Sequence, residues 1–209
     1  MIVFLDLETT GLDATKHSVL EVAAVVTDDT LVEVARFARV VRWQASEYML
    51  GEHATSRALH FGVDPVILQM HVENGLWMAS ATSGNSLLEV EQDLAELIRQ
   101  HCPDARSDDA RTGPQLAGNT IDFDRAFLKD ELPEVHALLH YRSIDCTTMN
   151  ELAKRFWPKL FADRPRAKGA HRAMSDVLES VETARYYAGA LRPREKLTAA
   201  DLERQENPL

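Results

Sequence analysis

The chain has little cysteine, with only Cys102 and Cys146 among its 209 residues. Two cysteines this far apart form no metal-binding motif, and sparse cysteine suits a reducing compartment. No apolar run approaches the ~20 residues that a membrane-spanning helix needs. Residues 1–5 are too short for the apolar core of a signal peptide and have no basic start. We therefore expect a cytoplasmic protein that has no membrane partner.

Basic residues are also scarce, with 23 Lys and Arg against 33 Asp and Glu and a formal net charge of −10. Proteins that track long nucleic acids neutralise many phosphates with basic surfaces, so this composition disfavours a long polyanionic ligand. A ligand with one or two phosphates needs only a few local donors or bound cations. An acidic chain can still bind such a ligand.

One domain accounts for most of the chain, because 209 residues with 45% hydrophobic content can bury a single substantial core. We expect that domain over residues 1–191 and a charged tail over 192–209. Hydrophobic patterning predicts strands over 2–8, 19–27 and 34–42, then helices over 65–73, 86–101, 121–131, 147–156 and 172–190. Small polar residues predict loops over 79–85 and 103–114. This order fits an α/β layer fold.

Two acids end the first predicted strand. Alternation along a strand places Asp6 and Glu8 on one face and Leu7 on the other. Carboxylates held this close share a proton or recruit a cation. An isolated pair of this kind is more often a solvated strand end, so acids elsewhere must decide between the two readings.

Further acids follow near the start of a predicted helix. Asn119 or Thr120 is a candidate N-cap before the apolar residues of 121–128. Asp124 would then lie in the first turn, where a helix N-terminus favours negative charge. Taken alone, Asp124 and its neighbour Asp122 could be simple capping acids.

His171 and Asp176 form a second suggestive pair. Five residues of helix turn through about 500°, so both side chains can serve one site only if His171 lies at or before the helix start. Pro165 and Gly169 favour a helix start in this region. A lone histidine is more often a surface or satisfied core residue, so the pair gains weight only in combination.

Taken in order, the four acids and the histidine resemble the DEDDh exonucleases of the ribonuclease-H-like superfamily. Four blocks carry the resemblance: residues 5–13, 117–128, 139–158 and 168–187. Within them, residues 140–148 and 150–158 resemble the oligoribonuclease branch. The resemblance implies a ribonuclease-H-like exonuclease fold of the α/β class, with a mixed central sheet flanked by helices.

The resemblance also implies the chemistry. Two divalent cations, Mg²⁺ or Mn²⁺, would be held by four carboxylates, and His171 would be the general base. Imidazole suits that role because its unperturbed pKa of ~6.5 lies near neutral pH. Glu8 would also contact the terminal 3′-hydroxyl, and the products would be nucleoside 5′-monophosphates. The four expected metal ligands are Asp6, Glu8, Asp124 and Asp176.

Substrate contacts carried over by position form a second set. A cap on the 5′ phosphate is expected from Arg142 and three threonines, with Tyr141 contributed by the other subunit of a homodimer. Leu12 is a candidate wedge against a base. Tyr141 could instead be a half-buried strand residue, and the paired threonines could be a helix N-cap. The full expected set is Leu12, His71, Asn119, Thr120, Tyr141, Arg142, Thr147 and Thr148.

The chain departs from the family pattern at several positions. Val66 stands where a tryptophan would stack on a base, and such stacking is worth ~1–3 kcal/mol per base. Thr147 replaces a serine and keeps its hydroxyl. Asn150 replaces a lysine and removes a positive charge, whereas Asp122 replaces a glycine and adds an acid. These changes bear on substrate choice and leave the hydrolytic residues intact.

Three functions compete at this point. The leading one is a 3′–5′ exoribonuclease that hydrolyses short oligoribonucleotides, dinucleotides above all, by a two-metal mechanism. The alternative is a broader 3′–5′ exonuclease for single-stranded DNA or RNA that uses the same residues. A third is a nucleic-acid-binding module with a dead site, and the five intact catalytic positions argue against it.

Overall fold

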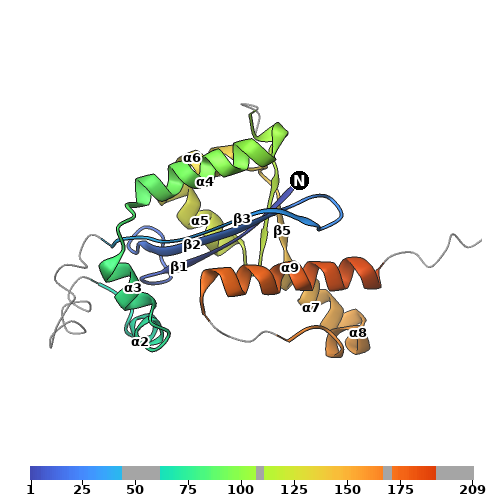
Figure 1. Ribbon diagram of the computed structural model, residues 1–209. Helices are drawn as coiled ribbons and strands as arrows, with labels where there is room; N and C mark the ends of the chain where they lie inside the picture. Colours follow the sequence, from blue (N-terminus) through green and yellow to red (C-terminus); the bar gives the residue numbers. More distant parts are fainter. Residues whose placement is uncertain (44–61, 107–110, 167–170, 192–209) are drawn as a thin grey trace, which may run out of the picture.

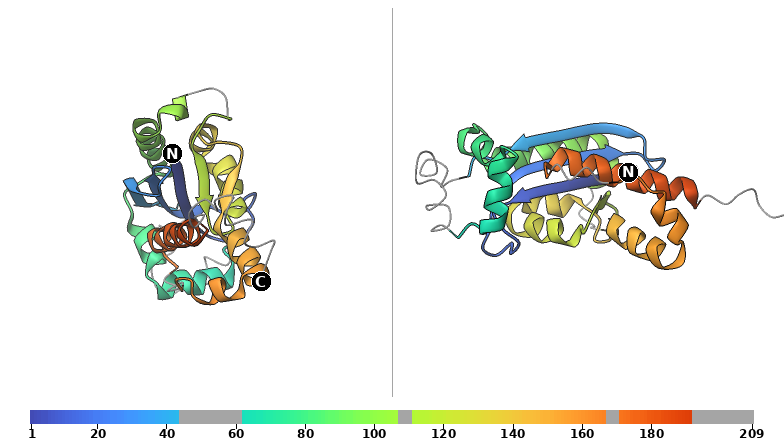
Figure 2. Two further views of the ribbon diagram at one scale, coloured as in Figure 1. Left: turned by 90° about the vertical axis from the view of Figure 1, so that its right-hand side faces the viewer. Right: turned by 90° about the horizontal axis from the view of Figure 1, so that it is seen from below.

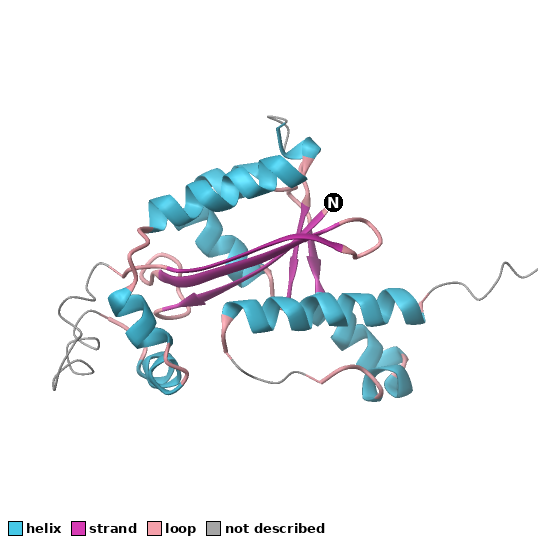
Figure 3. Cartoon of the chain, viewed as in Figure 1, coloured by secondary structure: helices cyan, strands magenta, loops and turns pink. Residues whose placement is uncertain are grey.

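The computed structural model describes residues 1–43, 62–106, 111–166 and 171–191. A central sheet is sandwiched between helices on its two faces, as the magenta strands and cyan helices of Figure 3 show. Figure 1 gives the labels of these elements. The predicted α/β fold with a mixed sheet is therefore confirmed.

The sheet has the strand order β3-β2-β1-β4-β5. β1 (Ile2–Thr9), β2 (Val19–Thr27) and β3 (Glu33–Val40) are antiparallel neighbours. β4 (Gln115–Gly118) and β5 (Ser143–Asp145) extend the sheet in parallel from β1. Every residue of β2 is buried, as expected for a strand covered on both faces.

Alternation along β1 divides its side chains between two cores. Leu5 and Leu7 face the layer formed by α4 (Leu87–His101), α5 (Asp122–Glu131) and α6 (Pro133–Leu138). Phe4 faces the long helix α9 (Ala173–Ala190) and packs with Val177 and Val181. In the view from below in Figure 2, α9 lies across the strands. Asp6 and Glu8 continue the Phe4 side of β1 toward α9.

The remaining helices lie around this sandwich. α2 (Pro65–Glu73) and α3 (Leu76–Thr82) cover one end of the sheet, where Leu20, Leu68 and Trp77 form a third apolar cluster. α7 (Cys146–Phe156) and α8 (Pro158–Ala162) lie on the same side of the sheet as α9 (Figure 1). A short 3₁₀ helix, η2, spans Pro103–Arg106.

Local signals explain where the main helices begin. Ser86 and Glu89 form a reciprocal capping box at the start of α4. Asp64 caps α2 by accepting hydrogen bonds from two backbone N–H groups, and proline follows at the first helical position. Asp145 caps α7 by accepting from Thr147 N–H at 2.8 Å. The predicted alternative of a Thr147–Thr148 N-cap pair is therefore wrong.

β1 extends beyond its neighbour β4 at the carboxyl end. β4 pairs with Ile2–Phe4 only and ends at Gly118. A Cβ at Gly118 would lie 2.8 Å from the Leu5 carbonyl oxygen, so glycine permits this close approach. The chain turns to opposite sides after these two parallel strands, toward β2 and toward β5, and such a switch point is where α/β sheets bind ligands.

The five predicted helices and three predicted strands are all present, with shifts of one or two residues at their ends. The predicted loop over 79–85 is wrong in its first half, because residues 79–82 belong to α3. The predicted loop over 103–114 begins with η2, and its residues 107–110 lie outside the described part. The short elements α6, α8, β4 and β5 were not predicted.

The predicted tail over 192–209 lies outside the described residues, so the boundary at 191 stays a prediction. Among the residues that the structure describes, no helix is long and apolar enough to cross a membrane.

Candidate active site

A cleft of about 330 Å³ opens at the carboxyl ends of β1 and β4. All five residues predicted to be catalytic line it, although they come from three separate parts of the chain. Three of the predicted substrate contacts, Leu12, Asn119 and Thr120, line it too. The full lining is Asp6, Leu7, Glu8, Leu12, Asn119, Thr120, Phe123, Asp124, His171 and Asp176.

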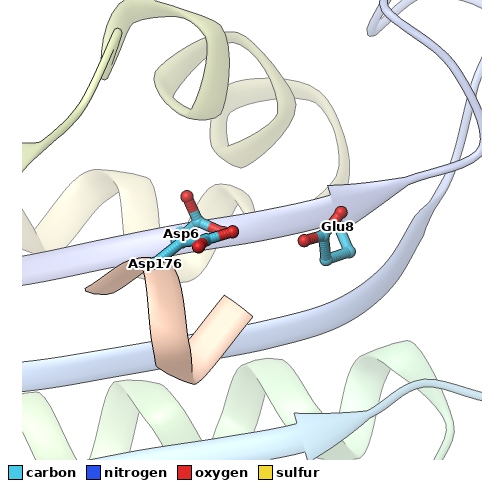
Figure 4. Close-up of side chains that lie close together, drawn as sticks. All are labelled: Asp6, Glu8 and Asp176. Atoms are coloured by element: carbon cyan, nitrogen blue, oxygen red, sulfur yellow. The ribbon is translucent and has the colours of Figure 1, made fainter. Parts of the chain in front are cut away.

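Three of the carboxylates meet between β1 and α9. Asp6 and Glu8 project from β1, and Asp176 approaches them from the first turn of α9 (Figure 4). One carboxylate oxygen of each lies within 4.8 Å of the others. One cation could therefore contact all three side chains.

Asp124 joins the cluster from α5. Its Oδ1 accepts a hydrogen bond of 2.9 Å from the Leu7 N–H, which β4 is too short to pair, and its side chain is buried. Asp124 therefore fixes the start of α5 against the free edge of β1. The N-cap of α5 is Ile121, which makes no side-chain cap. The prediction that Asn119 or Thr120 caps this helix is therefore wrong.

His171 meets the geometric condition that its spacing from Asp176 imposes. α9 begins at Ala173, so His171 precedes the helix and its side chain does not follow the helical rotation. Its backbone φ is +46°, an unusual value for a residue other than glycine. Asn74, which follows α2, donates a hydrogen bond of 2.5 Å from Nδ2 to the His171 carbonyl oxygen. The exposed imidazole is thus held at the mouth of the cleft.

Negative charge accumulates in this cleft. Burial, together with the charges of Asp124, Glu8 and Asp176, raises the pKa of Asp6 from 3.8 to about 9. Burial and the charge of Asp176 raise the pKa of Glu8 from 4.5 to about 8. Burial also raises the pKa of Asp124 to about 7, although its hydrogen bond with Leu7 N–H opposes the shift. Without a cation the cluster therefore retains protons near neutral pH.

The donor set fits a hard divalent cation. The converging ligand atoms are carboxylate oxygens, which Mg²⁺, Mn²⁺ and Ca²⁺ prefer, and no cysteine lines the cleft among the described residues. A bound cation would offset the burial and the mutual repulsion that raise the pKa values of Asp6 and Glu8. Asp6, Glu8 and Asp176 bring their ligand atoms together for such a cation, and Asp124 lines the same cleft.

A fifth acid, Glu21, was missed from the sequence. It lies on β2 directly opposite Glu8, and its side chain is buried. Glu21 accepts hydrogen bonds from Arg172 Nε at 3.0 Å and Nη2 at 2.7 Å, and from the Ala173 N–H at 3.1 Å. This bidentate pair fixes the first residues of α9 to the sheet. The available signals were an acid inside the apolar stretch 19–26 and an arginine next to His171.

The predicted phosphate-binding threonines gather around Asp145. Thr120 N–H donates to Asp145 Oδ1 at 3.1 Å and to Thr147 Oγ1 at 3.0 Å. The hydroxyl groups of Thr120 and Thr147 lie 3.2 Å apart, and Thr148 Oγ1 donates to Asp145 Oδ2 at 3.3 Å. Thr120 has a positive φ of 52°, which turns the chain here after β4. The structure thus brings together three of the four side chains expected in the cap.

Tyr141 and Arg142 lie in an exposed turn before β5. The Tyr141 ring is 54% exposed and stacks on His140 at a centroid distance of 4.7 Å. The turn lies outside β5, so the alternative of a half-buried strand residue is wrong. Arg125, the neighbour of Asp124, donates to Ser143 Oγ and to the His140 carbonyl oxygen, both at 3.0 Å. This guanidinium ties the turn to the helix that carries Asp124.

His71 and Leu12 have different surroundings. The His71 side chain is fully buried, with Nε2 2.9 Å from the Thr9 carbonyl oxygen and 3.9 Å from Glu8 Oε2. It lies next to Glu8 and is absent from the cleft lining, so the predicted contact of His71 with substrate stays a prediction. Leu12 is 71% exposed in the lining. Val66 is 78% exposed at the start of α2 and is absent from the lining.

Comparison with known proteins now identifies the family. The family described as "Exonuclease" matches residues 3–49. The oligoribonuclease of Corynebacterium glutamicum (strain R) is 37% identical over 186 residues, which cover 89% of this chain and 77% of that protein. The oligoribonuclease of Tropheryma whipplei (strain Twist) is also 37% identical, over 89% of this chain and 90% of its own length. The chain belongs to the oligoribonuclease family. It is therefore a nuclease, a 3′–5′ exonuclease, and metal dependence is general in this family.

Solved structures show the same fold at lower sequence identity. The exonuclease I of Methylocaldum szegediense aligns with a TM-score of 0.58 at 16% identity and covers 92% of this chain. An E. coli exonuclease I in complex with a dT13 oligonucleotide aligns with a TM-score of 0.56 at 15% identity over 89% of this chain. This chain spans about two fifths of the length of each exonuclease I chain, 41% and 40% respectively.

The raised pKa values make a prediction about stability. The pKa of Asp6 is 3.8 in the unfolded reference and about 9 in the cluster, so between these pH values the metal-free native state binds more protons than the unfolded state. Stability without metal therefore falls as the pH rises through that window. We expect the unfolding temperature in EDTA to fall more steeply with pH for the wild type than for Asp6→Asn. Added Mn²⁺ should stabilise the wild type more at about pH 8 than at about pH 5, because its ligands must be deprotonated.

Thermal unfolding scans of both proteins, with EDTA and with Mn²⁺, test this directly. Asp122→Asn is the matched control, because Asp122 is an exposed acid in the same turn of α5 as Asp124 and does not line the cleft. Parallel pH profiles for wild type and Asp6→Asn in EDTA would contradict the account of the cluster.

Proposed function

We propose that this chain is a two-metal 3′–5′ exoribonuclease that hydrolyses short oligoribonucleotides, dinucleotides above all, to nucleoside 5′-monophosphates. The observation that carries the proposal is the convergence of four carboxylates and His171 in one cleft. Short substrates are supported by the name of the curated relatives and by the net charge of −10. Neighbouring exonuclease I structures bind a single-stranded oligonucleotide, which supports a nucleic acid ligand.

The proposed cations are Mg²⁺ or Mn²⁺, held by Asp6, Glu8, Asp124 and Asp176. Divalent cations in such a site stabilise the charge that develops on the phosphodiester oxygens during hydrolysis. The protein contributes rigid placement: β1 orients two ligands, the Leu7 N–H fixes the third, and the Glu21–Arg172 pair fixes the helix that carries the fourth.

His171 is proposed as the general base. Its side chain lines the cleft beside the carboxylates and is exposed, so a water molecule can reach it. The imidazole would take one proton from the water as the water oxygen bonds to phosphorus and the bond to the leaving 3′-oxygen breaks. Two contacts hold the backbone of His171 in place. Asn74 donates to the His171 carbonyl oxygen, and the next residue, Arg172, is bound to Glu21.

The proposed 5′-phosphate cap consists of Thr120, Thr147, Thr148 and Arg142, beside Asn119 in the cleft. Asp145 lies at the centre of the threonines, but its oxygens accept hydrogen bonds from Thr120 N–H, Thr147 N–H and the Thr148 hydroxyl. Arg142 is exposed and stands 5.2 Å over the Tyr141 ring. A phosphate in this cap would anchor one end of a short strand and so limit substrate length.

A homodimer is proposed from the surface next to the cap. Leu152 and Phe156 share one face of α7, and Trp157 follows directly. These three side chains are 40%, 66% and 47% exposed, and the exposed Tyr141 precedes the same helix. Exposed apolar surface of this kind marks interaction sites, and an isologous dimer would place Tyr141 near the cap of its partner.

The cytoplasm is the proposed compartment, since Cys102 and Cys146 are both free thiols. The proposed catalytic domain spans residues 1–191.

Length dependence tests the proposed function. With Mn²⁺ or Mg²⁺, the purified protein should turn over a 5′-phosphorylated dinucleotide at least about tenfold faster than a strand of roughly twenty nucleotides, because a long strand with its 3′ end at the carboxylates does not place its 5′ phosphate in the proposed cap. Quantifying released mononucleotide measures both rates. Equal or faster turnover of the long strand would instead support the broader exonuclease.

Three variants are compared in that assay. Arg142→Ala should remove most of the preference for a 5′ phosphate, whereas the exposed Arg36 on β3, which pairs with Glu33, gives a neutral comparison as Arg36→Ala. His171→Ala should lose almost all turnover while still binding Mn²⁺, because it removes the proton acceptor and no metal ligand.

Complementation tests the dimer and the role of Tyr141 in trans. Light scattering should give a mass near twice 23.5 kDa. Tyr141→Ala and His171→Ala should each be nearly inactive on the dinucleotide, and mixing them should restore about a quarter of wild-type activity through one complete site per mixed dimer. Mixing Tyr141→Ala with a variant that carries both substitutions should restore nothing. A fully active monomer would refute the proposal.

A further inference from the structure

The lining of the cleft has an apolar part beside the carboxylates. Leu12 and Phe123 both belong to the lining, and Leu7, the third apolar member, is almost fully buried. Among the described lining residues, Phe123 is the only Phe, Tyr or Trp. The cleft therefore combines a charged region suited to a phosphodiester with one large apolar aromatic ring.

Phe123 is firmly held in this position. It lies in the first turn of α5, directly before Asp124, and its N–H donates to the Thr120 carbonyl oxygen at 2.9 Å. One side of its ring packs against Phe127, with ring centroids 5.0 Å apart and an interplanar angle of 54°. Phe127 is fully buried, whereas Phe123 is only half-buried. The core thus fixes the ring and leaves part of it open to the cleft.

Leu12 is held as well, although its side chain is exposed. The turn that carries it is closed by a hydrogen bond of 3.1 Å from Asp13 N–H to His17 Nδ1. Gly11 makes room for the same imidazole, because a Cβ at Gly11 would lie 2.3 Å from the His17 ring. Leu12 is therefore a positioned apolar contact at the cleft.

Val66 stands at the position where the resemblance predicts a tryptophan that stacks on a base, so no aromatic ring is present there. Its side chain lies outside the lining and has no aromatic face. A base bound near the carboxylates can then stack on the Phe123 ring, since His171 is the only other aromatic side chain in the described lining and is the proposed general base.

We propose that Phe123 is the base-stacking residue of this chain, with Leu12 as the second apolar contact of the same nucleobase. The inference rests on the proposed function, and it assigns the substrate-binding residue that supplies the stacking absent at Val66. Because Phe123 is adjacent to Asp124 on one helical turn, a stacked base is placed in register with the carboxylates. Stacking does not depend on the hydrogen-bonding groups of the base, so the Phe123 ring can accept all four bases.

Paired substrates test this proposal. The wild type and Phe123→Leu are compared on a dinucleotide and on the same dinucleotide lacking its 3′ base. Leucine keeps an apolar side chain and removes the ring, so KM for the complete dinucleotide should rise roughly tenfold while kcat stays within about twofold. KM for the substrate without the base should not change. Phe123→Tyr, which keeps the ring, should behave as the wild type.

Leu88→Ala is the matched control, since Leu88 is 61% exposed on α4 and does not line the cleft. It should leave both KM values unchanged. Equal losses of Phe123→Leu on both substrates would show a purely structural role and overturn the proposal, as would an unchanged KM on the complete dinucleotide.

Binding of a non-hydrolysable dinucleotide, with and without its 3′ base, is measured in parallel by fluorescence anisotropy. A wild type without turnover would refute the proposed function. The ratio of the affinities for the dinucleotide with and without its 3′ base would still test the role of Phe123. Loss of the base-dependent affinity in Phe123→Leu supports stacking on Phe123, and an unchanged ratio of the two affinities overturns it. Thermal unfolding confirms that each variant is folded.

Discussion

Mutual repulsion among buried carboxylates is the constraint on which the rest of this structure depends. Burial and neighbouring acids raise the pKa values of Asp6 and Glu8 to about 9 and about 8, so bringing these groups together costs free energy in the absence of a cation. The fold opposes that cost with specific contacts. Leu7 N–H holds Asp124, and the Glu21–Arg172 pair holds the start of α9.

The same contacts divide the charges of the site into two groups. Arg172 and the Ala173 N–H satisfy Glu21, so that acid is engaged in fixing the helix. The four remaining acids line the cleft and are the proposed ligands of the cations. His171 directly precedes Arg172 in the chain and lines the cleft. One hydrogen-bonded pair therefore positions both the proposed base and the proposed ligand Asp176.

Much of this arrangement was predictable because it follows from local rules. Alternation along β1 places Asp6 and Glu8 together, and the spacing of His171 from Asp176 required a helix start between them, which Ala173 provides. The partners of Glu21 could not be predicted, because they join residues 151 and 152 positions apart. The burial of His71 could not be predicted for a similar reason, because it depends on the packing of α2 against the end of β1. Phe123 was not predicted as a site residue, because a phenylalanine inside an apolar pattern is expected to be buried in the core. Its partial exposure depends on how α5 packs beside the cleft.

The central claim is that the four carboxylates of the cleft hold divalent cations, and counting bound Mn²⁺ tests it most directly. Titration followed by electron paramagnetic resonance at neutral pH should show two Mn²⁺ ions per wild-type chain. Asp124→Asn should bind fewer ions or bind them more weakly, whereas Asp122→Asn, altered in the same turn but outside the lining, should match the wild type. Wild-type protein that binds no Mn²⁺, or an Asp124→Asn variant that binds it as the wild type does, would contradict the account.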